Sequence, residues 1–341
     1  MSLIASVFGI ALFARQYGVS CQKCHTVIPH LNEFGGHFLA SGDRIPGISS
    51  GPGLPLAAKV NLVDSSADQG SGDGGAGLPR AIVDEIEAFT AGTIGARASF
   101  FAEQYVLDGG VAGALREAWV SDRVNPWSAR VPLYVEAGSF TLPLPVDPET
   151  FRETAQHYAV FDQTVANNPF NFFDPQYGVK ATIGNTLRGV SAQVYARRDT
   201  MAFVSDAIGP ITAGIYHYRG VRPDIPGRDD RFERTGYSVV IDAGKWTSES
   251  VLQTGWDSSA AGCGVASSGG FTQLRYAFDR RFFAIARYEG VDQDGGNGFA
   301  RDGVVGVGYA PQRNARMTLE DVLVTQPRTT NTMNLQVTVG I

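Results

Sequence analysis

Apolar and polar side chains alternate in short segments along most of this chain, from about residue 57 to its end. Clear examples are AKVNLV at 58–63, VSAQVYAR at 190–197, YSVVID at 237–242 and LQVTVGI at 335–341. Successive side chains of a strand point to opposite faces, so this alternation predicts β-strands with one apolar face. Gly, Asp, Asn and Pro between the segments predict turns.

The alternation test predicts about fifteen strands, and since bacterial outer-membrane barrels have an even number, we expect about 14 or 16. Residues 142–174 break this rhythm with a stretch rich in Pro, Asn and Phe. That stretch is long for a turn and predicts a loop or short helix that folds over an opening or into a lumen. The predicted strands lie near 57–64, 80–90, 94–107, 112–123, 131–141, 175–185, 187–198, 209–218, 233–243, 245–256, 270–279, 281–290, 301–310, 314–324 and 333–341.

The N-terminal residues and the composition of the chain bear on where the protein is located in the cell and what it binds. Residues 1–14 (MSLIASVFGIALFA) are apolar with small residues among them, which predicts a signal-like segment with cleavage near Ala14. No stretch approaches the roughly 20 apolar residues of a membrane-spanning helix. The net charge is −6, and no basic stripe is present to neutralise phosphates, which argues against a nucleic-acid partner.

Two architectures contain many alternating strands: a soluble sandwich or propeller, and an outer-membrane barrel with its apolar face outward. A propeller should repeat every 40 to 50 residues or so, and no such motif recurs. The signal-like start, the 11% aromatic content and the alternating last strand favour the membrane. The predicted fold is an all-β, antiparallel transmembrane β-barrel with a short N-terminal helical c-type haem segment as its plug or lid.

That haem segment rests on Cys21, Gln22, Lys23, Cys24 and His25, which form a CxxCH motif. Two thiols at this spacing can add to the haem vinyl groups, and the adjacent imidazole then lies beneath the iron. A redox dithiol would normally follow a strand of a βαβ unit, and a zinc site needs a second ligand pair at zinc spacing. Neither context surrounds the motif, so one covalent haem c is the predicted cofactor.

The predicted organisation follows from these features. It comprises a signal-like segment at 1–14, a monohaem cytochrome c segment at 15–45, a Gly/Pro/Ser-rich linker at 46–56 and the barrel at 57–341. A haem segment of about 30 residues cannot bury enough surface by itself, so the barrel must cover it. The third cysteine, Cys263, stands in a Gly/Ser/Ala loop, where an inert thiol is the expected interpretation.

The second axial ligand of the iron is left open by the motif, because His, Met or another donor can fill it. His37 is the first candidate, since the run from Pro29 to Leu39 predicts a separate helix that could fold over the opposite haem face. His30 is expected on the proximal side, close to His25. The remaining candidates are His157, Met201, Met317 and Met333.

The N-terminal residues resemble a known family. FARQYG at 13–18, CQKCH at 21–25, Pro29, Leu31, Phe34 with Gly35, Phe38 and Gly42 are similar to the fused monohaem cytochrome–porins of the outer membrane, which are best known as iron oxidases. About 30 residues carry the match, and the rest is similar only in length and strand rhythm. The resemblance implies thioether bonds at Cys21 and Cys24 and proximal ligation by His25.

These inferences lead to two main hypotheses. The first is electron transfer across the outer membrane, in which extracellular Fe(II) or another donor reduces the haem and a periplasmic c-type cytochrome or other carrier accepts the electron. Such a protein would be an iron:cytochrome oxidoreductase in contact with outer-membrane lipids. The alternative is an outer-membrane porin or scaffold protein in which the haem is structural or accessory. A soluble periplasmic β-protein bearing a haem is a third interpretation.

Overall fold

The structure is a computed structural model of the 341-residue chain. Cys263 and most of the signal-like segment lie outside the described residues. The residues it describes are 12–45, 48, 50–51, 55–66, 82–125, 131–148, 151–165, 168–184, 189–225, 228–258, 264–293, 299–312, 314–325 and 329–340.

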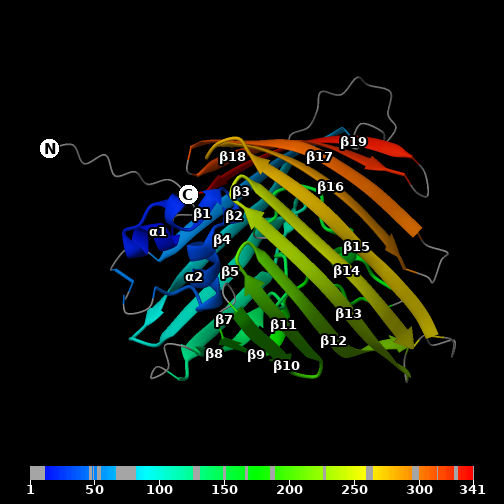
Figure 1. Ribbon diagram of the computed structural model, residues 1–341, viewed down its shortest axis with the longest axis horizontal. Helices are drawn as coiled ribbons and strands as arrows, with labels where there is room; N and C mark the ends of the chain where they lie inside the picture. Colours follow the sequence, from blue (N-terminus) through cyan, green and yellow to red (C-terminus); the bar gives the residue numbers. More distant parts are fainter. Residues whose placement is uncertain are drawn as a thin grey trace.

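Within these residues, sixteen long antiparallel strands close into one barrel (Figure 1), and a two-residue strand, β6 (Val111–Ala112), extends the pairing of β5. The long strands are β3 (Leu56–Ser65), β4 (Ile82–Ile94), β5 (Ala98–Asp108), β7 (Leu115–Arg123), β8 (Leu133–Phe140), β9 (Gln176–Gly184), β10 (Gly189–Ala196), β11 (Thr200–Ile208), β12 (Ile211–Ile225), β13 (Arg228–Ala243), β14 (Trp246–Ser258), β15 (Gly264–Ala277), β16 (Phe282–Asp292), β17 (Phe299–Gln312), β18 (Ala315–Val324) and β19 (Thr330–Gly340).

The last strand closes the barrel on the first. Val337 of β19 pairs with Leu62 of β3, so no strand edge is left open to lipid. The predicted antiparallel barrel and its strand number are confirmed. The predicted strands nevertheless omit β11, and the reason is physical. Its segment carries Met201 and Phe203 on the buried face and Val204 on the exposed one, so the polar contrast that marks a period of two is weak.

The outer surface of the barrel is apolar and the inner surface is more polar. Along β13, Tyr237, Val239 and Ile241 are exposed, while Ser238 between them and Arg234 earlier in the strand are buried in the lumen. The same alternation runs through the neighbouring strands, and it is the pattern of a strand with lipid on one side and a polar lumen on the other.

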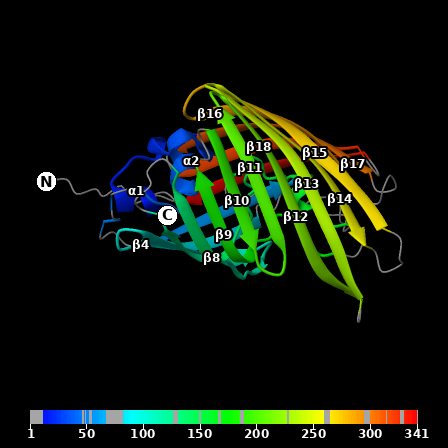
Figure 2. The same cartoon turned by 60° about the horizontal axis from the view of Figure 1, so that its bottom comes forward.

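The two ends of the barrel differ. At one end the strands are joined by tight turns, such as Gly209–Pro210 between β11 and β12 and Gly244–Lys245 between β13 and β14. Short turns face the periplasm in outer-membrane barrels. Exposed aromatic side chains, among them Trp246 and Phe282, lie beside these turns, where a membrane-interface girdle is expected. Figures 1 and 2 show the N-terminal helices and the C-terminus at this same end.

The N-terminal segment is built from short elements. They are α1 (Leu12–Tyr17), the 3-10 turn η1 (Cys21–Lys23), the strands β1 (His25–Val27) and β2 (His30–Leu31), and α2 (Glu33–Ala40). The expected helix therefore begins at Glu33 instead of Pro29, because Asn32 caps it: its Oδ1 accepts a hydrogen bond from the Gly35 N–H at 3.0 Å. No helix among the described residues is long and apolar enough to cross a membrane.

The stretch that breaks the strand rhythm connects β8 to β9 and folds into the lumen, as predicted. It contains one short helix, α3 (Ala159–Asp162), which contacts β15 and β16 on the inner wall. Its Phe161 and Phe172 are 1% and 2% exposed and belong to a luminal cluster with aromatic residues of the strands. We call residues 141–175 the luminal segment.

Candidate haem site

Hydrogen bonds hold the N-terminal segment in the short-turn mouth of the barrel. The side-chain amide of Gln16 donates to the Ala91 carbonyl at 2.6 Å, and the Ser99 hydroxyl donates to the Gly42 carbonyl at 2.5 Å. The ring of His30 lies beside the carboxylate of Asp242 on β13. These contacts reach both β4–β5 and the far wall, so the segment lies across the mouth, and we call it the plug.

Close packing at Gly35 fixes helix α2 against the CxxCH motif. A Cβ atom at Gly35 would lie 2.2 Å from the Cys24 carbonyl oxygen, a distance that no side chain tolerates. Phe38, one turn further along the helix, meets the ring of Phe13 edge-on with the centroids 4.9 Å apart. The glycine in the sequence thus permits α2 to sit directly on the motif.

A backbone carbonyl fixes the orientation of the His25 imidazole. Its Nδ1 atom lies 2.9 Å from the Pro29 carbonyl oxygen, and because a carbonyl only accepts, Nδ1 must carry the proton. The lone pair therefore remains on Nε2, the atom available to a metal. Burial lowers the pKa of His25 below its usual 6.5, which keeps the imidazole neutral, as metal ligation requires.

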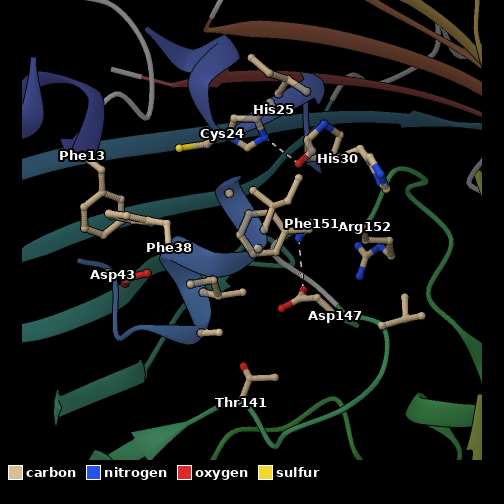
Figure 3. A pocket seen from close by; sticks show the side chains of 18 of the residues that line it. Phe13, Cys24, His25, His30, Phe38, Asp43, Thr141, Asp147, Phe151 and Arg152 are labelled. Atoms are coloured by element: carbon tan, nitrogen blue, oxygen red, sulfur yellow. Dashed lines mark hydrogen bonds between the residues drawn. The ribbon is translucent and has the colours of Figure 1, made fainter. Parts of the chain in front are cut away.

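Cys21, Cys24 and His25 all line the cavity, and Figure 3 shows Cys24 next to His25. Burial raises the pKa of the Cys24 thiol, and the neighbouring Cys21 raises it further. A redox dithiol typically has a lowered thiol pKa, so this environment does not favour that alternative. Among the described residues no group of three or more His, Cys, Asp or Glu side chains is placed to hold a metal ion.

The cavity has a volume of about 610 Å³, within the range of cofactor and ligand sites. Its floor is the N-terminal segment, and its opposite wall is the first part of the luminal segment. The Phe151 ring lies 6.5 Å from the His25 ring, centroid to centroid. Much of the lining is apolar, as the face of a porphyrin requires, and includes Phe34, Phe38, Phe101, Phe140, Leu142 and Val146.

Charged side chains also reach the cavity. The amine of Lys59 lies 2.5 Å from Glu87, and that of Lys180 lies 2.7 Å from Glu136, so both lysines are ion-paired. Asp43 is buried at the end of α2 with a positive φ of 58°, an uncommon conformation for a residue other than glycine. Burial raises the pKa of Asp43 well above 3.8, and the Glu136 and Glu117 carboxylates raise it further.

The structure brings together some of the predicted ligands and separates others. Cys21, Cys24, His25 and His30 line the cavity, whereas His37, on α2, is absent from its lining. His157 stacks on Phe173 with the ring centroids 4.4 Å apart. Met201 belongs to the luminal cluster, and Met317 and Met333 are exposed on the barrel wall. The second axial position thus remains a prediction, and His30, expected on the proximal side, lines the cavity with its Nε2 beside Asp242.

Sequence reasoning missed several cavity residues because they come from outside the motif. Arg152 belongs to the luminal segment and Arg316 to β18, and both guanidinium groups reach the same cavity. The only signal for Arg152 was its place in a stretch too long to be a turn. Arg316 has none, because an inward arginine looks like any other luminal residue in an alternating strand.

No protein-family model matches the sequence, and no curated protein matches it. Among solved structures, the anion-selective porin from Comamonas acidovorans is similar with a TM-score of 0.62, 12% identity, and coverage of 84% of this chain and 98% of the porin. Salmonella typhi OmpF in its complex with daunomycin is similar with a TM-score of 0.60 and 12% identity, over 84% of this chain and 97% of OmpF. The DcaP channel of Acinetobacter baumannii is similar with a TM-score of 0.55 and 10% identity, over 87% of this chain and 100% of DcaP.

At these identities the likeness concerns the fold, which is that of outer-membrane porins. Together with the apolar outer surface and the closed sixteen-strand barrel, it places this chain in the bacterial outer membrane. With the short turns facing the periplasm, the candidate haem site lies at the periplasmic end of the lumen.

Proposed function

We propose that this protein carries single electrons through the outer membrane by way of one covalent haem c in the periplasmic mouth of its barrel. The observation that carries the proposal is the His25 imidazole: its Nδ1 is engaged by Pro29, and it lines a cavity shared with both motif cysteines. The haem would supply one-electron chemistry when bound. The donor would be extracellular Fe(II) or another reductant, and the acceptor a periplasmic c-type cytochrome or similar carrier.

The residues of the chain have distinct tasks in this function. Cys21 and Cys24 would hold the cofactor through thioether bonds, and His25 would ligate the iron through Nε2. Phe34 and Phe38 supply apolar lining on one side of the cavity, and Phe151 of the luminal segment supplies it on another. A dry, apolar surround is one of the means by which a protein sets a haem potential.

The filled lumen supports a conduit over an open channel. The luminal segment packs Phe161 and Phe172 against wall residues such as Tyr216 and Phe271, so aromatic rings occupy space that ions would need. The N-terminal segment lies across the periplasmic mouth as well. Electrons can cross packed protein where ions and water cannot, which fits a protein that links two compartments without mixing their contents.

Anaerobic optical spectroscopy tests the proposal. The full chain, purified in detergent, should show a c-type spectrum with one covalent haem per chain by pyridine haemochrome assay. Addition of Fe²⁺ at acidic and neutral pH should reduce the haem on the timescale of mixing if iron is the donor. Reduction by dithionite and not by Fe²⁺ would remove iron as the donor, and absence of covalent haem would overturn the proposal itself.

Variants separate haem attachment from barrel integrity. Cys21→Ala with Cys24→Ala should yield a folded barrel, seen by its heat-modifiable migration on gels, that lacks covalent haem. His25→Gly should keep the thioether bonds and lose the native optical spectrum, and added imidazole should restore it. Failure of imidazole to change the spectrum of His25→Gly would exclude His25 as the axial ligand.

The alternative function is a porin or scaffold protein with an accessory haem, and the porin-like structural neighbours favour it. The two functions differ in what crosses the lumen. Planar-bilayer recording decides between them: a porin should show stable ion conductance with the haem in place, whereas the proposed conduit should show little.

A further inference from the structure

Among the described residues, two arginine side chains of the cavity wall have no carboxylate oxygen within ion-pair distance. Arg152, from the luminal segment, and Arg316, from β18, are each only 8% exposed. Arg152 donates from Nε to the Thr154 carbonyl at 2.8 Å and from Nη1 to the Pro148 carbonyl at 3.1 Å. Both acceptors are neutral carbonyl oxygens, so these hydrogen bonds supply no negative charge to the guanidinium group.

Arg316 lies directly beside Arg152. Its Nη1 donates to the Arg152 backbone carbonyl at 3.1 Å, and its Nη2 donates to Gln336 Oε1 at 3.2 Å. The two guanidinium groups therefore share one corner of the cavity, and each raises the cost of burying the other. Glu85 also lines the cavity and attracts Arg152 at longer range, while its carboxylate accepts a hydrogen bond from Asn61.

Other buried cations of this barrel have a carboxylate partner within ion-pair distance. Arg234 pairs with Asp257 at 2.6 Å, Arg275 with Glu153 at 3.0 Å, and both cavity lysines have glutamate partners. Arg152 and Arg316 differ from these cations in having only longer-range carboxylates, among them Glu85 and Glu153. Their guanidinium groups can therefore bind an anion that enters the cavity.

We propose that Arg152 and Arg316 form the binding site for the carboxylate substituents of the haem, its propionates, and so orient the cofactor edge opposite the motif cysteines. The inference rests on the proposed function, because it needs haem in this cavity. Guanidinium groups suit this task, since their planar forks match carboxylates in a bidentate geometry. Two cations in one corner match two propionates on one edge of a porphyrin.

This assignment gives the luminal segment a role in the cofactor site. Arg152 directly follows Phe151, the residue whose ring faces His25, so one turn of the segment would cover the haem face and hold its propionates (Figure 3). Because the segment connects β8 to β9 within the barrel, the haem would link the plug to the wall. The arginines are positioning residues, and they also neutralise negative charge near the iron.

The test measures the haem potential of charge-neutral variants in the full, haem-loaded chain. Arg152→Gln and Arg316→Gln leave propionate charge uncompensated and favour ferric haem. Each should lower the midpoint potential by about 59 mV, which corresponds to a tenfold change in the one-electron equilibrium. Arg152→Lys keeps the charge and should retain most of the potential. The matched control is the pair Arg234→Gln with Asp257→Asn, which removes a luminal ion pair away from the cavity lining.

Resonance Raman spectroscopy supplies a second readout, because the propionate bending band reports hydrogen bonding to those groups. The band should shift in both glutamine variants and stay unchanged in the control. Loss of haem from Arg152→Gln, with haem retained in Arg152→Lys, also supports the site. Unchanged potential and unchanged band in both glutamine variants would overturn it. Absence of haem in the wild-type chain would instead refute the proposed function, so the two failures are distinguishable.

Discussion

The Nε2 atom of His30 lies 3.6 Å from Oδ2 of Asp242, and this contact joins the hairpin of the CxxCH motif to strand β13. His30 is largely buried, with 15% of its side chain exposed, whereas Asp242 is 41% exposed. The pair bridges the mouth of the barrel to a wall remote from the strands that follow the plug in sequence. Breaking this contact therefore tests how much it contributes to docking of the plug.

Removing this contact should loosen the plug and leave the barrel intact. Because Asp242 is partly exposed, we expect Asp242→Asn to weaken docking by at most roughly 1 kcal/mol, equivalent to at most about fivefold in the opening equilibrium. Limited proteolysis of the N-terminal segment should accelerate accordingly, while heat-modifiable migration on gels stays unchanged. Arg97→Gln, which removes an exposed ion pair to Asp122 within the barrel wall, should not change the cleavage rate.

A methyl group at Gly35 should separate α2 from the motif. Its Cβ would lie 2.2 Å from the Cys24 carbonyl oxygen and 2.9 Å from the Leu31 side chain, so the backbone must move. Overpacking of this kind costs about 1–3 kcal/mol. Gly35→Ala should therefore reduce the yield of covalent haem, measured by pyridine haemochrome assay. The same substitution at Gly303, where a Cβ meets nothing within 4 Å, should have no such effect.

The sequence predicted the barrel because its period-two pattern is set by the environment on each side of a strand. Residues such as Val239 and Ser238 differ in polarity for one reason, lipid on one side and lumen on the other. The motif at Cys21 to His25 was equally visible, because porphyrin geometry fixes its spacing. Both signals come from residues that are close together in the sequence, so they can be recognised without knowledge of the fold.

The walls of the cavity were not visible in the same way. Arg152 and Arg316 come together only when the luminal segment folds inward and meets β18. The Pro29 carbonyl that orients His25 is a backbone atom, which leaves no trace in side-chain identity. Strand β11 was missed because an aromatic lumen hides the usual polar contrast. Long-range geometry, more than composition, separates what was predicted from what was not.

Asp43 should make the docking of the plug depend on pH. Burial raises its folded-state pKa above the ordinary value of 3.8, so between these two values the folded state binds a proton that the unfolded state does not. Its contribution is thus complete below about pH 3.8 and is lost as pH rises through the raised pKa. Asp43→Asn should stabilise the plug at neutral pH, on the order of 1 kcal/mol.

Urea titrations of the detergent-solubilised protein, monitored by near-UV circular dichroism, measure this effect. The wild type and Asp43→Asn should unfold alike near pH 4 and diverge at pH 7.5, with the variant more resistant. Asparagine also tolerates the positive φ at this position, which acts equally at both pH values. An equal offset at both values would therefore attribute the gain to backbone conformation and contradict the pH dependence.

Aromatic packing in the lumen should limit ion flow. Phe161 and Phe172 are almost completely buried where the luminal segment meets the wall, and Phe→Ala substitutions in such cores cost about 3–5 kcal/mol each. Phe161→Ala with Phe172→Ala should free the segment and raise conductance in planar bilayers several-fold above a low wild-type value. Phe278→Ala, at an exposed position, should not. Because the plug lies across the periplasmic mouth, adding Asp242→Asn to these variants should raise the conductance further. Porin-like conductance in the wild type would instead show that neither the luminal segment nor the plug obstructs the lumen.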